Sequence, residues 1–70
     1  MNIEIYYAIK FYNGTYYNDT KRHSVNKLRH AKLFENKEGA QQGIEFIVKN
    51  QIFPIGTDDM SVVKVLIREG

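Results

Sequence analysis

Apolar and polar residues alternate along the first stretch of the chain, from Ile3 to Phe11. The apolar positions are Ile3, Ile5, Tyr7, Ile9 and Phe11. A period of two with β-branched and aromatic residues on one face is typical of a β-strand. Asn13-Gly14 follows at once, and both residue types tolerate the positive φ angles of a two-residue type I′ turn. The pattern therefore predicts a β-hairpin that spans Ile3 to Tyr17.

The predicted turn also determines which side chains share a face of the hairpin. A two-residue turn places Phe11 opposite Tyr16 and Lys10 opposite Tyr17. If the apolar positions of the first strand face a helix, the side chains on the other face are Tyr6, Ala8, Tyr12 and Tyr17. No second helix is predicted to cover that face.

A helix is predicted after Asn36, which is a good N-cap residue. Its apolar positions recur at helical spacing and make one face. They are Ala40, Ile44, Ile47 and Val48. Gly43 lies close to that face, so we expect a tight approach of the helix to the sheet. The helix should end at Asn50-Gln51, because Pro54 forbids a long extension.

The last predicted strand runs from Met60 to Arg68, after an apolar connection at 52–55 and a polar turn at 56–59. It is apolar on both faces apart from Lys64. Strands of that kind are usually central in their sheet, so we expect this one at the centre, beside the first strand.

The segment from Lys21 to Lys32 has a weaker pattern. Val25, Leu28 and Ala31 recur every third residue, which predicts either one helical turn or a loop pinned by two side chains. Residues 31–34 follow as a candidate short strand with Leu33 inward. Together the patterns predict an α+β domain with the order β-β-(short β)-α-β: a small, mostly antiparallel sheet of three to four strands with one helix packed on one face.

Composition limits the size and class of the protein. The sequence has 70 residues, which is room for a single domain, residues 1–70. It has no cysteine, so neither a disulfide nor a zinc–thiolate site is available. A hydrophobic fraction of 43% favours a folded core over disorder. No apolar run approaches a membrane span, and the first residues lack the pattern of a signal peptide, so we expect a cytoplasmic protein.

Candidate catalytic and metal-binding residues are few. Ser24 follows His23, but sequence adjacency does not make a nucleophile–base pair. Asp58-Asp59 lacks the further carboxylate of a calcium loop, and His23 and His30 would be two turns apart on one helix. We therefore expect no enzyme, no metal and no cofactor.

Two kinds of binding surface remain as alternatives. The tyrosine-bearing sheet face, together with Phe46 on the helix, predicts a protein interface. Its candidate residues are Tyr6, Tyr12, Tyr17 and Phe46, and its partner is either a second copy of the chain (a homodimer) or another protein. The segment from Lys21 to Lys32, which we call the basic segment, instead predicts contacts to nucleic-acid phosphates, with tyrosine stacking on bases. Its candidate residues are Lys21, Arg22, Lys27, Arg29, Lys32 and Tyr16.

Some of these segments resemble known small proteins. The similar features are Tyr-Ala-Ile-Lys at residues 7–10 before the turn, residues 31–40, the short helix and the valine-rich last strand. In these features the chain is similar to uncharacterised accessory proteins of phages that infect low-GC Gram-positive bacteria. The usual form of the middle motif has an acidic residue where Gly39 stands. The resemblance implies a phage-encoded protein that binds, and in many cases inhibits, a host factor or defence complex. It assigns no functional residue.

Overall fold

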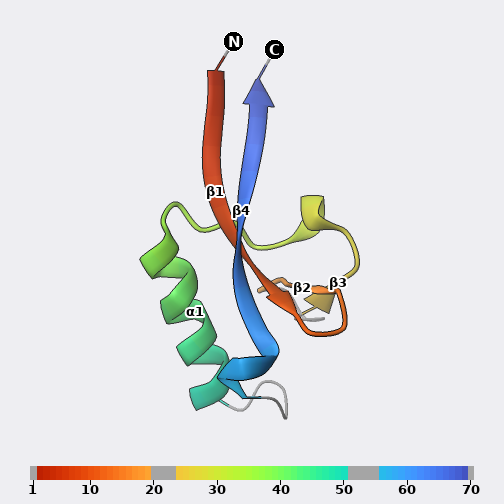
Figure 1. The fold of residues 1–70 in the computed structure, drawn as a ribbon, viewed down its shortest axis with the longest axis vertical. Helices are drawn as coiled ribbons and strands as arrows, with labels where there is room; N and C mark the ends of the chain where they lie inside the picture. Colours follow the sequence, from red (N-terminus) through yellow and green to blue (C-terminus); the bar gives the residue numbers. More distant parts are fainter. Residues whose placement is uncertain (1, 20–23, 51–55, 70) are drawn as a thin grey trace.

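The computed structural model describes residues 2–19, 24–50 and 56–69, and it shows a four-stranded antiparallel sheet with one α-helix packed on it (Figure 1). The elements in chain order are β1 (Asn2–Phe11), β2 (Tyr16–Tyr17), β3 (Ser24–Val25), η1 (Leu28–His30), α1 (Lys37–Lys49), η2 (Thr57–Asp59) and β4 (Met60–Glu69). The order of strands across the sheet is β3-β2-β1-β4. The predicted α+β class and its single packed helix are therefore confirmed.

The β1–β2 hairpin forms, but its predicted register is wrong. Lys10 pairs with Tyr16, and the Phe11 N–H donates to the Thr15 carbonyl at 2.8 Å. Gly14 has φ +87, and its N–H donates to the Phe11 carbonyl at 3.0 Å. The loop thus has three residues, a turn followed by a left-handed glycine, which is the next most common hairpin connection after the two-residue turn.

This one-residue shift moves a predicted surface residue into the core. Strand side chains alternate between faces, so a register change of one exchanges the two faces of β2. Tyr17 therefore lies on the same face as Ile9, packs in the core and is only 6% exposed. The prediction that Tyr17 faces away from the helix is wrong.

Helix α1 follows its predicted boundaries. The Asn36 side chain accepts a hydrogen bond from the Gly39 N–H at 2.6 Å, and Asn50 caps the other end. Three of the four predicted apolar positions are buried, namely Ala40, Ile44 and Ile47. The expected close approach at Gly43 is also present, because a methyl group there would lie 2.9 Å from Phe34 Cζ and 3.0 Å from Ile9 Cδ1.

The short third strand lies earlier in the chain than predicted. Ser24 and Val25 pair with Tyr17 and Tyr16, and η1 supplies the predicted single helical turn. In the segment predicted as a strand, Phe34 makes only one isolated bridge, to Tyr7. The predicted apolar connection at 52–55 lies outside the described residues.

Strand β4 is at an edge of the sheet, so the prediction that it is central is wrong. Its apolar character has another cause, which is cover on both faces. Helix α1 packs on one face, where Met60 and Val62 join the core. On the opposite face Val65 is 8% exposed and Ala8 of β1 is fully buried.

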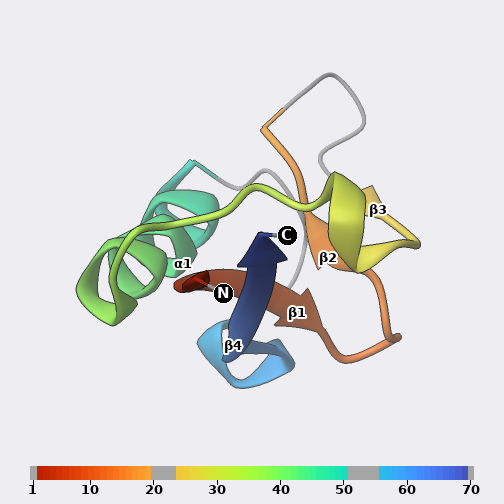
Figure 2. The same ribbon diagram turned by 90° about the horizontal axis from the view of Figure 1, so that it is seen from above.

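That opposite face is covered in part by the segment that contains η1, which corrects the expectation of an uncovered face. Leu28 and Leu33 lie against the C-terminal half of β4, where they help to line a common groove. Figure 2 shows α1 and η1 on different sides of the β1–β4 pair. The connection between them passes beside Tyr7 of β1, on the side away from β4. There the Tyr7 N–H donates to the Phe34 carbonyl, and the Phe34 N–H donates to the Tyr7 carbonyl.

Candidate protein-binding surfaces

The N-terminal half of β1 and the C-terminal half of β4 extend together past α1 (Figure 1). We call this part, residues 2–6 paired with residues 65–69, the ribbon. It contains β1–β4 partners throughout, from Asn2 opposite Glu69 to Tyr6 opposite Val65. The reason is a difference in length. Ten strand residues span about 33 Å, whereas the 13 residues of α1 span about 20 Å.

Three large aliphatic side chains share the helix-side face of the ribbon. Ile3 is 54% exposed, Ile5 is 49% exposed and Leu66 is 63% exposed. Ile5 and Leu66 are direct cross-strand partners, so their side chains lie on one face. We call these three residues the ribbon patch. Ile3 and Ile5 are on the same strand face as the buried Ile9, as the alternation predicts, but they are not covered, because they lie past the end of α1.

A groove lies on the opposite side, between the η1 segment and β4. It has a volume of about 580 Å³, and its apolar lining residues are Leu28, Leu33, Val65, Leu66 and Ile67. Arg29 and Arg68 also line it. Together with the ribbon patch, the groove leaves apolar surface on both sides of the C-terminal half of β4.

The four residues predicted to bind a protein do not form one surface. Tyr6 is half-buried on the groove side, and its hydroxyl donates to Glu4 Oε2 at 2.8 Å. Tyr12 is 74% exposed at the hairpin turn, and Phe46 is 53% exposed on α1. Tyr17 is buried in the core. The predicted tyrosine face is therefore divided among three separate parts of the molecule.

The phenol of Tyr17 has a raised pKa. Burial raises the pKa of the Tyr17 phenol because it disfavours the charged phenolate, and the nearby negative charge of Asp19 raises it further. Tyr17 is thus a neutral core residue at physiological pH.

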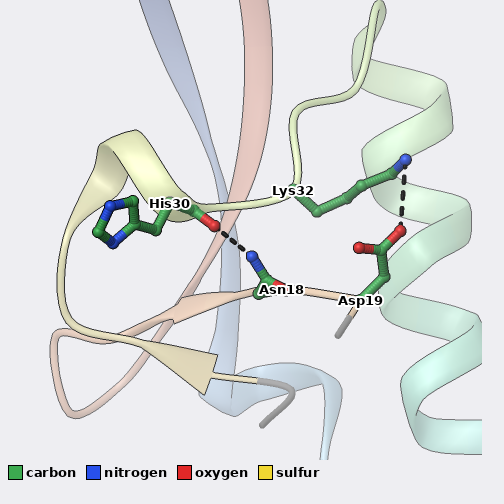
Figure 3. A network of polar contacts seen from close by, with 4 residues as sticks. All are labelled: Asn18, Asp19, His30 and Lys32. Atoms are coloured by element: carbon green, nitrogen blue, oxygen red, sulfur yellow. Dashed lines mark hydrogen bonds and ion pairs between the residues drawn. The ribbon is translucent and has the colours of Figure 1, made fainter. Parts of the chain in front are cut away.

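The basic segment is less uniformly positive than its sequence indicates. Lys32 Nζ lies 3.5 Å from Asp19 Oδ2 in an exposed ion pair (Figure 3). The Asn18 amide in the same figure donates to the His30 carbonyl and ties β2 to the end of η1. Lys27 and Arg29 are exposed, whereas Lys21 and Arg22 lie outside the described residues. Tyr16 is half-buried beside Val25, its partner on β3.

Within residues 2–19, 24–50 and 56–69 no group of three or more acidic, histidine or cysteine side chains is placed to hold a metal ion. In the same part of the chain, no helix combines the length and the apolar character that crossing a bilayer requires. Ser24 is half-buried in β3 and His30 is exposed, while His23 lies outside the described residues.

Comparisons with known protein families, curated proteins and solved structures find no match to this chain. The function of the protein is therefore inferred from its geometry. Sequence patterns did not identify the ribbon patch as a surface, because Ile3 and Ile5 have the same alternation as the buried Ile9. The signal that was available is the length of each element: the first strand is predicted to be longer than the helix that covers it.

Proposed function

We propose that this protein is a non-enzymatic binding domain that recognises another protein through the ribbon patch. The observation that supports this most is the exposure of three large aliphatic side chains, about half of each or more, on one face of a projecting two-stranded ribbon. Apolar groups that gather at one exposed site are typical of protein interfaces.

The resemblance to phage accessory proteins extends this proposal to the partner. It favours a host enzyme or a host defence complex, with inhibition as the result of binding. The location that goes with this proposal is the cytoplasm of the host cell.

A capture experiment tests the surface. The tagged protein is incubated with host lysate, with and without nuclease, and retained proteins are identified by mass spectrometry. Ile5→Ser is compared with Phe46→Ser, since the two side chains have similar exposure (49% and 53%) but lie on different parts of the molecule. We expect Ile5→Ser to lose the partner and Phe46→Ser to retain it. Capture that depends on Phe46 or Tyr12 instead would place the interface elsewhere and refute the ribbon patch.

Nucleic-acid binding is a second candidate, favoured by the exposure of Lys27 and Arg29 at η1. Affinity for DNA or RNA should then fall steeply with salt. Arg29→Glu should weaken binding, whereas Lys49→Glu on α1, which changes the net charge equally, should not. Fluorescence anisotropy with single- and double-stranded probes measures both effects. A chain that binds no probe at low salt would rule this candidate out.

A further inference from the structure

Among the described residues, no backbone group bonds to the outer edge of β4. β4 has β1 on one side only, and no other strand of the described sheet lies beside it. The other end of the sheet is β3, which has two residues. Edges that short resist pairing, whereas a long apolar edge strand is a template for another chain. β4 has ten residues, so it is the edge of interest.

The hydrogen bonds of Tyr7 show which groups point outward from β4. The Tyr7 N–H donates to the Phe34 carbonyl at 2.8 Å, and the Phe34 N–H donates to the Tyr7 carbonyl at 2.7 Å. Both groups of Tyr7 therefore point away from β4. Lys64 is the antiparallel partner of Tyr7, so its own N–H and carbonyl point away from β1. By the period of two, the same holds for Val62, Leu66 and Arg68.

We propose that this edge pairs with the β4 edge of a second copy of the chain, antiparallel, about a two-fold axis through Val65. A two-fold axis perpendicular to a sheet keeps each face continuous, so residues on the same face stand opposite each other. The two registers that pair the most residues are centred on Lys64 and on Val65. Centring on Lys64 sets Lys64 directly opposite Lys64 of the second copy, which is unfavourable.

The register centred on Val65 places no like charges opposite each other. It pairs Ser61 with Glu69 of the second copy, Val62 with Arg68 and Lys64 with Leu66. Lys64 and Leu66 both direct their N–H and carbonyl outward, so this pair exchanges two backbone hydrogen bonds. Val65 and Val65 of the second copy form the central pair without hydrogen bonds. The avoidance of a Lys64–Lys64 pair thus selects this register.

The joined sheet also orients the apolar surfaces. Both α1 helices lie on the same face, and the antiparallel strands bring the ribbon of each copy beside the helix-bearing half of the other. The ribbon patch of each copy is then on the same side of the sheet as α1 of its partner. This inference rests on the proposed function in one respect, which is that the domain acts by binding a protein. It uses the backbone edge of β4 and not the Ile5 side chain.

The test begins with molar mass measured by light scattering and sedimentation over a range of concentrations. We expect the wild-type chain to dimerise. Leu66 is 63% exposed, so its replacement should leave the monomer folded, which circular dichroism checks. In the proposed register Leu66→Lys faces Lys64 of the second copy, and Leu66→Glu offers it an opposite charge. The two dissociation constants should differ by about tenfold, with Leu66→Glu tighter.

Cross-linking checks the register. The wild-type chain has no cysteine, so one cysteine can be introduced at a time. Pairs without hydrogen bonds bring Cα atoms within about 4.5 Å, which a disulfide can bridge. Oxidised Val65→Cys should therefore form a covalent dimer, whereas Lys64→Cys should not.

A monomer at about 1 mM chain would overturn the dimer. A dimer that cross-links through Lys64→Cys, or that is insensitive to the charge at residue 66, would overturn the register. A monomer that still loses its lysate partner in Ile5→Ser would refute the dimer but support the proposed function. A dimer that captures no partner would support the dimer but count against the proposed function.

Discussion

At the scale of single residues, Tyr17 shows how a local turn determines the position of a side chain. Gly14 with φ +87 gives the hairpin a three-residue loop. Lys10 thereby pairs with Tyr16, and Tyr17 joins the core. The Asn13 carboxamide oxygen accepts from the Thr15 N–H at 3.1 Å and from Thr15 Oγ1 at 2.7 Å, which stabilises that loop. A residue that sequence alternation placed on the surface is therefore a buried phenol with a raised pKa.

The raised pKa of Tyr17 predicts a loss of stability at alkaline pH. The phenol of an unfolded chain ionises near pH 10, while the pKa of the Tyr17 phenol in the folded chain is higher. Its contribution to stability is therefore complete below about pH 10 and is lost as the pH rises through the raised pKa of the folded state. Tyr17→Phe has no proton to lose, so its free energy of unfolding should fall less above pH 10 than that of the wild type.

Urea unfolding at several pH values measures this difference. Tyr12→Phe is the control for the loss of one hydroxyl, because Tyr12 is 74% exposed. Equal alkaline destabilisation of Tyr17→Phe and the wild type would contradict the assignment of Tyr17 to the core.

At the scale of elements, β4 combines an interior composition with an edge position. Helix α1 and the η1 segment cover its two faces, and β1 is its neighbour in the sheet. Val65 is buried while Leu66, the next residue, is 63% exposed. The cover of β4 therefore extends further toward its C-terminal end on the η1 side than on the α1 side. Lys64 and Arg68 are exposed charges of the kind that limit random pairing of edges. In the proposed dimer Lys64 selects the register.

Amide hydrogen exchange should alternate along β4. In dilute protein the N–H groups of Val63, Val65 and Ile67 point toward β1 and should exchange slowly. Those of Val62, Lys64 and Leu66 point outward and should exchange fast. At concentrations where the dimer forms, the second set should become protected as well. Two-dimensional NMR after transfer to heavy water resolves each residue, and outward amides that stay fast in a confirmed dimer would exclude the edge as its interface.

At the scale of the whole molecule, the core and the candidate surface occupy different halves. The fully buried large side chains are Ile9 and Ile47, where α1 crosses the sheet. The ribbon extends beyond them with no helix against its apolar face (Figure 1). The molecule is elongated, with extents of 41 × 23 × 19 Å. A chain of this size buries a small apolar core and is only marginally stable. Three large aliphatic residues that stay exposed at one end therefore favour a binding role for that end over a role in stability.

This division predicts unequal effects of two equivalent substitutions. Ile9→Ala removes a side chain that is fully buried and should lower the free energy of unfolding by about 2–5 kcal/mol. Ile5→Ala removes one that is 49% exposed and should cost less than about 1 kcal/mol. Chemical denaturation of dilute protein, in which the monomer dominates, measures both. Similar losses for the two variants would mean that the ribbon patch is part of the core.

Local patterns in the sequence determined the three long elements, β1, α1 and β4, and which residues share a face on each of them. The alternation from Ile3 to Phe11 predicts β1, and the cap at Asn36 predicts where α1 begins. Both are decided by residues close together in the chain, so one sequence contains the necessary information. The apolar face of α1 and the close approach at Gly43 follow from the same local spacing.

Only the tertiary structure decided how far each element reaches and what lies beside it. The apolar character of β4 is the same for a central strand and for an edge strand covered on both faces, and the η1 segment that provides the second cover is distant in sequence. Likewise Ile5 and Ile9 have equivalent positions in the apolar alternation of the first strand. The N-terminal end of α1 lies toward the ribbon (Figure 1). Ile9 packs against the helix and is buried, whereas Ile5 lies beyond the helix and is exposed. The candidate site depends on where α1 packs along the sheet, which contacts between distant segments decide and periodicity does not.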